Sequence, residues 1–264
     1  MKEDITMKLL KKIINQIPIL NKLLRLIYRK IRPENKQNPS YWINKYIPNE
    51  PIQVIQIGAN DGVSGDPLHS LVKKNKLWNV LFVEPVPQMF DLLKKNYGSS
   101  PRFIFENSGI NDSGSNQMFY MIGDEAYQAN PKLSNDYQQI GSFSRAHVQK
   151  LATTALEQYI VAVEVECLRL NELLKKHNIK TIELLQIDAE GYDWKILSQL
   201  KLHEYKPIII AFEGVNLAEE EKKQARKQLQ IEYHVFVIGI NYLCIRKDKL
   251  RDSDFEILSK INQN

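Results

Sequence analysis

The sequence predicts an α/β fold built on one mainly parallel sheet with helices on both faces, and three observations support this prediction. Short apolar runs alternate with amphipathic helical stretches along most of the chain, the pattern of parallel strands joined by crossover helices. Of the 264 residues, 43% are apolar, enough to build one well-buried core. The last two apolar runs lack a long helix between them, so they predict an antiparallel hairpin.

Seven apolar runs give the expected strands. They are residues 52–57, 80–83, 103–106, 182–187, 208–212, 233–238 and 242–245. The helical patterns between them are MFDLLKKN (89–96), NELLKKHN (171–178), YDWKILSQL (192–200) and AEEEKKQARKQL (218–229). We expect these elements to form one domain over residues 41–264.

The segment before this domain, residues 1–40, is a basic extension that ends in the joint RPENKQNPS. Residues 1–32 contain nine Lys/Arg and two acidic residues, which leaves 27 basic and 29 acidic residues for the rest of the chain. Residues 7–32 place Leu and Ile at helical spacing between the basic residues. This pattern is typical of a helix that lies on an anionic membrane surface, and equally of one that packs on its own domain or on a partner.

The composition argues against several classes of protein. Pro18, Lys22 and Arg25 interrupt the N-terminal apolar clusters, so neither a signal peptide nor a spanning helix is expected. The domain has no basic stripe interleaved with aromatics, so no nucleic-acid surface is expected. Cys167 and Cys244 lie in apolar runs, typical of reduced core thiols and consistent with a cytoplasmic protein. The sequence does not indicate an oligomeric state.

Residues 123–158 interrupt the alternation of strands and helices, since they are rich in Tyr, Gln, Asn and Ser with no clean period. Long irregular insertions in compact domains are usually functional or mobile, so we predict a lid or substrate loop here. Ser142, Arg145 and His147 become candidate acceptor contacts by their position in it. A lone loop histidine is more often simply solvated.

The turn after the first strand contains Gly58 and Gly62, with Gly65 close behind. Glycines at the carboxyl end of a parallel strand let backbone N–H groups approach a ligand, although a tight turn without a ligand has the same composition. The spacing does not match the GxGxxG of dinucleotide sites. Glu84 ends the next strand, where a carboxylate can accept both ribose hydroxyls of a nucleoside or simply be solvated.

Together, the motifs VIQIGANDGVSGDPL, FVEPVPQMFDLLKKNY and LNELLKKHNIKTIELLQIDAEGYDWKIL resemble the FkbM family of S-adenosylmethionine (SAM)-dependent methyltransferases. The resemblance covers about residues 50–247 in order and spacing, and IDAEGYD is its most specific part. It implies a Rossmann-like, seven-stranded class I fold, SAM as methyl donor, and O-methylation of sugars, glycans or secondary metabolites.

Carried over position by position, the resemblance implies a role for each matching residue. Gly58, Ala59, Asn60, Asp61 and Gly62 match the turn around the methionine part of SAM, and Glu84 matches the ribose-binding acid. Asn107 and Ser108 match positions near the adenine, while Asp188 and Glu190 match the acidic fourth-strand motif that faces the methyl group and the acceptor in the family. Gln56 is a departure, because many class I methyltransferases have an acid there that helps hold the cofactor's ammonium. Glutamine keeps an acceptor oxygen without the charge, which predicts lower affinity.

Transfer to a hydroxyl needs a base, because the proton must leave as the oxygen attacks. Asp188 is the first candidate and Glu190 the second, although Asp188 also suits a helix cap. Glu213 ends the fifth strand and is a candidate for the acceptor side, with a cap or salt bridge as the alternative. Asp188, Glu190 and Asp193 offer oxygen ligands for a cation, but no further ligand is identifiable, so no metal is expected.

The leading hypothesis is therefore a SAM-dependent methyltransferase, O-directed toward a sugar, glycan or glycolipid acceptor, and the basic extension would suit work at the inner membrane face. The alternative is a non-catalytic binding or scaffold protein with the same fold, for which Gln56 is the best support. A nicotinamide-dependent oxidoreductase has the wrong glycine spacing.

Overall fold

The computed structural model describes residues 35–134, 137 and 139–262. The chain divides into two compact units, residues 1–36 and 37–264. The predicted amphipathic helix over residues 7–32 lies outside the described residues, so its membrane contact stays a prediction. Within the described ranges, every helix is too short or too polar to cross a membrane.

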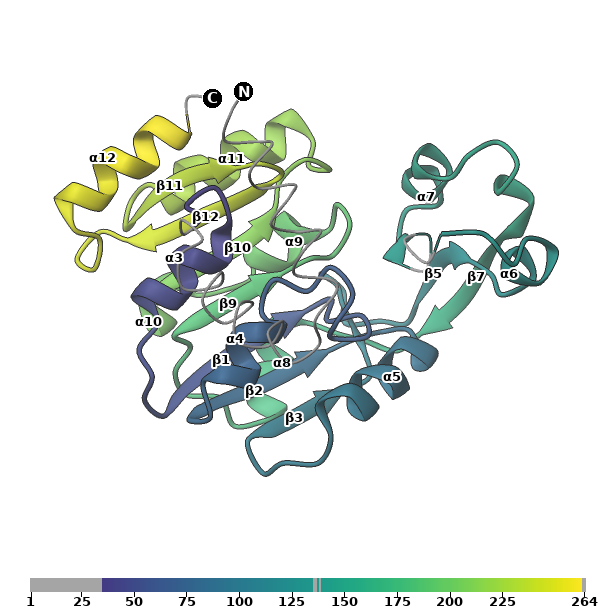
Figure 1. The fold of residues 1–264 in the computed structure, drawn as a ribbon, viewed down its shortest axis with the longest axis horizontal. Helices are drawn as coiled ribbons and strands as arrows, with labels where there is room; N and C mark the ends of the chain where they lie inside the picture. Colours follow the sequence, from purple (N-terminus) through teal and green to yellow (C-terminus); the bar gives the residue numbers. More distant parts are fainter. Residues whose placement is uncertain (1–34, 135–136, 138, 263–264) are drawn as a thin grey trace, which may run out of the picture. The chain divides into compact units, whose positions relative to one another are not determined.

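A seven-stranded sheet forms the core of the second unit (Figure 1). Its strands are β1 (Ile52–Ile57), β2 (Trp78–Val83), β3 (Phe103–Glu106), β9 (Leu184–Ile187), β10 (Ile209–Glu213), β11 (Tyr233–Ile238) and β12 (Asn241–Arg246). They lie in the order β11-β12-β10-β9-β1-β2-β3, and β12 pairs antiparallel with both its neighbours while the other pairs are parallel. The predicted Rossmann-like sheet with a C-terminal hairpin is confirmed.

Helices cover both faces of this sheet because alternate residues of each strand point to opposite sides. On one face, Val54, Val80 and Leu184 belong to a core cluster shared with helices on that side. Those helices are α3 (Pro39–Tyr46), α4 (His69–Lys74), α5 (Pro87–Tyr97) and α12 (Asp252–Ile261). On the other face, Ile55 and Leu185 belong to a second cluster. Its helices are α8 (Leu170–Lys176), α9 (Asp193–Leu197), α10 (Leu202–Tyr205) and α11 (Glu219–Leu229).

Residues 111–166, which we name the lid segment, form a smaller structure with its own apolar cluster. Its elements are β5 (Gln117–Ile122), α6 (Glu125–Ala129), β6 (Gly141–Ser142), α7 (Arg145–Leu151), a 3₁₀ helix (Glu157–Tyr159) and β7 (Ile160–Val165). β5 pairs antiparallel with both β6 and β7. Residues 123–158 are therefore more regular than predicted, since they contain two short helices and a strand.

The two ends of the lid segment run side by side where they join the main fold. β4 (Gly109–Ile110) precedes the segment, β8 (Cys167–Leu168) follows it, and the two pair in parallel with Gly109 opposite Cys167. Gly109 N also donates a hydrogen bond to Glu166 O at 2.8 Å. A short two-stranded ladder therefore closes the base of the lid segment.

Candidate active site

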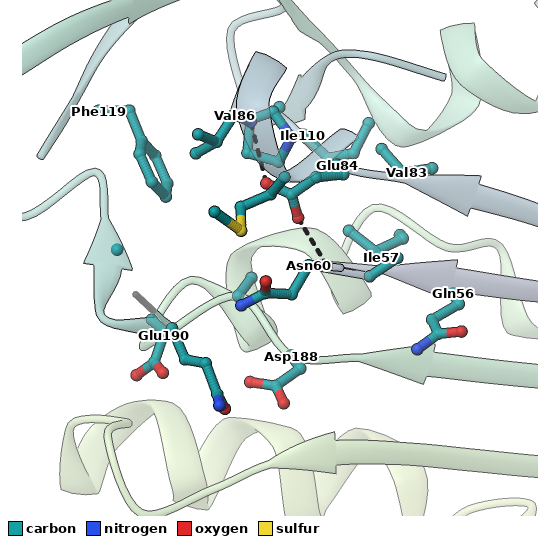
Figure 2. A pocket seen from close by; sticks show the side chains of 18 of the residues that line it. Gln56, Ile57, Asn60, Val83, Glu84, Val86, Ile110, Phe119, Asp188 and Glu190 are labelled. Atoms are coloured by element: carbon teal, nitrogen blue, oxygen red, sulfur yellow. Dashed lines mark hydrogen bonds between the residues drawn. The ribbon is translucent and has the colours of Figure 1, made fainter. Parts of the chain in front are cut away.

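A pocket opens at the carboxyl ends of β1, β2 and β9, and residues of the lid segment form part of its wall (Figure 2). Parallel strands end at the same edge of a sheet, so side chains far apart in the sequence meet there. The predicted site residues that line this pocket are Gln56, Gly58, Ala59, Asn60, Glu84, Ser108, Asp188 and Glu190.

Gly58 has a φ of +77°, and it lies against the backbone of Asp188 at the end of the neighbouring strand β9. A Cβ at this position would lie 1.8 Å from Asp188 O. Asp188 N donates to Ile57 O at 2.9 Å, which fixes the ends of β1 and β9 together. Because Gly58 has no side chain, the backbone of Asp188 can pack directly against the turn.

Asp61 and Gly62 shape the turn from behind the pocket wall. The Asp61 carboxylate accepts hydrogen bonds from Val63 N and Ser64 N at 2.8 and 2.7 Å, and these bonds, which outweigh its partial burial, lower the pKa of this group. A Cβ on Gly62 would lie 2.6 Å from the Leu93 side chain, so this glycine permits close packing of α5. Their predicted contact with a cofactor stays a prediction.

Glu84 is 5% exposed and fixes the turn to the end of β2. Its two oxygens accept from Asn60 N at 2.8 Å and Val86 N at 2.9 Å (Figure 2). Burial raises the pKa of this carboxyl to about 7. Each carboxylate oxygen has two acceptor sites, so both oxygens retain capacity for ligand hydroxyls.

Asn107 and Ser108, at the end of β3, point in different directions. Asn107 Nδ2 donates to Glu84 O at 2.8 Å, which places it against the backbone of the wall. Ser108 lines the pocket, and its buried Oγ has no hydrogen-bond partner among the residues that the structure describes.

Three carboxylates gather beside the glycine turn. Oxygens of Asp188, Glu190 and Glu213 lie within 4.8 Å of one another. Surrounding protein raises the pKa of Asp188 well above its usual range, and the charges of Asp193, Glu213 and Glu190 raise it further. Although protein surrounds it, Asp188 is accessible from the pocket. Glu190 has a φ of +46°, an uncommon conformation for a non-glycine residue and one often found at functional sites.

Asp193 differs from the other acids because it is fully buried. It accepts from Ala189 N at 3.3 Å and Glu213 N at 3.1 Å, so it ties the end of β9 to β10. Burial raises its pKa to about 7, and the charge of Glu213 adds to this effect. The third member of the oxygen cluster is thus Glu213, whereas the sequence suggested Asp193. Carboxylates at such distances are the kind of ligand that divalent cations use.

The lid segment contacts the IDAEG turn through two of the predicted acceptor residues. Ser142 Oγ donates to Glu190 O at 2.9 Å, and His147 Nε2 lies 3.1 Å from Glu190 Oε2. His147 is therefore paired with an acid rather than simply solvated. Arg145 is exposed on α7, and Glu213 Oε2 accepts from Asn216 Nδ2 at 2.6 Å. The role of these residues in acceptor binding stays a prediction.

Apolar side chains that the sequence did not single out complete the wall. Phe119, Met121 and Phe143 come from the lid segment, and Val86 and Met89 come from the start of α5. Figure 2 shows Phe119 facing Val86 across the pocket. The run QMFYMI (117–122) was the available signal, but its pairing partner begins about forty residues later.

The pocket fits the cofactor that the sequence resemblance implies. Ser108 Oγ and Gln56 Oε1 are buried and have no partner among the described residues, so a bound polar ligand would satisfy them. Glu84 retains acceptor sites where ribose hydroxyls are expected, and the apolar wall suits a base. The acids of the pocket suit a ligand with a sulfonium and an ammonium group.

Comparison with known protein families identifies the FkbM methyltransferase domain in this chain. A model of the methyltransferase FkbM domain matches residues 56–241, which is more than half of the chain. The solved methyltransferase FkbM from Methylobacillus flagellatus KT is 12% identical, with 75% of this chain and 44% of that chain covered at a TM-score of 0.44. The Methanococcus jannaschii fibrillarin pre-rRNA processing protein is 10% identical, with 76% and 69% covered at 0.40. The search of curated proteins returns no match.

Proposed function

The chain belongs to the FkbM methyltransferase family and uses SAM as its methyl donor, and we propose that it methylates a hydroxyl of a sugar, glycan or glycolipid acceptor. The observation that supports the proposal is the group of three carboxylates, Asp188, Glu190 and Glu213, at the pocket beside the glycine turn. A hydroxyl must lose its proton during transfer, whereas an amine needs positioning alone. An acidic acceptor side therefore favours a hydroxyl.

Each part of the site has a role in this proposal. SAM supplies an electrophilic methyl group bound to a positive sulfur. Glu84 would accept the ribose hydroxyls, and the turn from Gly58 to Asn60 would hold the methionine part. Phe119 and Phe143 of the lid segment would exclude water. When bound, SAM would supply the methyl group to the acceptor oxygen, and its sulfur would keep the electron pair of the broken carbon–sulfur bond. Asp188 would accept the proton that the acceptor hydroxyl loses. The surrounding protein raises the pKa of Asp188, and a carboxylate with a raised pKa binds the transferred proton more strongly once it is deprotonated.

The test is transfer of a labelled methyl group from SAM to sugar and lipid fractions, with wild type and Asp188→Asn. We expect kcat to fall about 10²- to 10⁴-fold in the variant, because a positioned base contributes that much. Affinity for S-adenosylhomocysteine should stay within about threefold. Asp91→Asn, an exposed change on α5, is the matched control. Full activity of Asp188→Asn would refute its role as base, and label found in amines alone would refute the acceptor class.

The same measurements separate the non-catalytic alternative. A scaffold protein with this fold would bind SAM or its product in calorimetry and yet release no labelled product from any fraction. Binding of NAD in place of both would contradict the family assignment.

We also propose that residues 7–32 bring the enzyme to the inner face of an anionic membrane in the cytoplasm, which would suit a lipid-linked acceptor. The support is the basic amphipathic pattern of this segment. The full chain should sediment with anionic vesicles and less with neutral ones, while a chain without residues 1–32 should not. Equal sedimentation of the two chains would refute the proposal.

A further inference from the structure

Gln56 has no charge where many class I methyltransferases have an acid, but its side chain is hydrogen-bonded to one, Asp66. Gln56 is 3% exposed at the end of β1, and it lines the pocket. Its Nε2 donates to Asp66 Oδ1 at 3.0 Å, so the amide is joined directly to a carboxylate ten residues later in the chain. Its Oε1 is buried without a donor among the described residues. A negative group therefore lies one hydrogen bond away from the place where many class I methyltransferases have an acid.

Asp66 is held in place from three sides. Oδ1 also accepts from Leu68 N at 2.7 Å, and Oδ2 accepts from Tyr97 Oη at 3.2 Å. The preceding Gly65 has a φ of +69°, and both residues line the pocket with Gln139 of the lid segment. The carboxylate thus belongs to the same wall as the glycine turn and has a fixed orientation.

The other acids in or near the pocket have different contacts or positions. Glu84 is engaged with the turn backbone at the end of β2, and Asp188 and Glu190 lie at the acceptor side with Glu213. Asp61, the other acid of the loop, is turned toward its own backbone. Asp66 has no ion-pair partner among the described residues, and burial raises its pKa. The three hydrogen bonds and the charge of His69 do not offset the burial, so a cationic ligand group would stabilise the charged form of this carboxylate.

We propose that Asp66 supplies the negative charge that binds the ammonium group of SAM in this enzyme, and that Gln56 acts as a positioning residue for it. The acid that position 56 lacks is thereby provided from the loop between β1 and α4. This proposal rests on SAM as the cofactor, and it removes the loss of affinity that Gln56 alone would predict.

The test is calorimetry on the full chain with two ligands that share the nucleoside. S-adenosylhomocysteine has the amino-acid part, and 5′-methylthioadenosine lacks it. Asp66→Asn keeps the shape and the acceptor for Leu68 N while removing the charge. We expect affinity for S-adenosylhomocysteine to fall at least about tenfold, because loss of one member of a partly buried charge pair has a large effect. Affinity for methylthioadenosine should stay within about twofold.

Two further variants make the result specific. Gln56→Glu combined with Asp66→Asn moves the charge to the other end of the hydrogen bond, and it should restore at least half of the lost binding free energy. Asp91→Asn controls for net charge and should change neither ligand. A change in the ratio of the two affinities below about threefold would overturn the assignment of Asp66. Equal weakening of both ligands would also overturn it, because that result indicates disturbed structure. A wild-type chain that binds neither ligand would contradict the cofactor itself.

Discussion

Replacement of Gly58 by alanine should disrupt the junction between the glycine turn and Asp188. The added Cβ would lie 1.8 Å from Asp188 O and 2.8 Å from Asp188 C, both backbone atoms that cannot move without breaking the β1–β9 pairing. The φ of +77° adds a second penalty, because a side chain disfavours that conformation.

The two effects can be given magnitudes. A positive φ costs an alanine about 1–2 kcal/mol, and overpacking of a tight site costs about 1–3 kcal/mol. Gly58→Ala should therefore lower the free energy of unfolding by about 2–5 kcal/mol, a large share of the ~5–15 kcal/mol typical of a domain. With a urea m-value of about 2 kcal/mol per M, the midpoint should fall by about 1–2.5 M.

Gly239→Ala provides the matched control in the same urea titration. Gly239 has a φ of +62° in the turn between β11 and β12, and a Cβ there would meet nothing within 4 Å. It should show the conformational penalty alone, about 1–2 kcal/mol. If Gly58→Ala is no less stable than Gly239→Ala, the close contact between Gly58 and the Asp188 backbone at the ends of β1 and β9 is wrong.

Three more perturbations have defined outcomes. Burial raises the pKa of Glu84 from 4.5 to about 7, so the unfolded chain loses this proton at lower pH than the folded chain does. The stability of the protein without ligand should therefore fall as the pH rises from about 4.5 to 7. Glu84→Gln should reduce this fall in urea titrations at pH 5 and 7.5, and an unchanged fall would contradict the prediction. Asp254→Ala removes the acceptor for Lys45 Nζ at 2.6 Å and for Tyr46 Oη. It should lower the free energy of unfolding by about 1–3 kcal/mol in the same urea titration. A decrease of less than about 0.5 kcal/mol would show that this contact between α3 and α12 does not stabilise the fold. His147→Ala should speed hydrogen exchange in α7 several-fold by freeing the lid segment from Glu190, and unaltered exchange would show that the pair does not hold it.

The central sheet was predictable because its strands are buried on both faces. Val54 and Ile55 pack on opposite sides of β1, so apolar residues occupy both faces of the strand, and a strand of this kind stands out between turns. The lid segment was harder to predict. Its strands β5 and β7 are partly exposed, and Gln117 pairs with Val165 across a long separation that local patterns do not show.

The sequence predicted which residues lie at the ends of the strands, but not which way each side chain points or which loop residues it contacts. Strand order brings Glu84 and Asp188 to one edge, so their meeting follows from topology. Which of two adjacent side chains faces the pocket depends on local backbone direction, and Ser108 does so while Asn107 turns back to the wall. The bond between Gln56 and Asp66 depends on the path of a loop, which the sequence pattern does not specify.

The ladder of β4 and β8 has a consequence for how the fold can vary. Since the chain leaves the main fold at Gly109 and returns beside it at Cys167, any replacement for residues 111–166 needs only two neighbouring attachment points. Closing a longer replacement adds little entropy penalty, because that penalty grows only with the logarithm of length. Chimeras that exchange this segment between relatives should therefore keep the central sheet and the glycine turn intact, while the part of the pocket wall that Phe119, Met121 and Phe143 form changes.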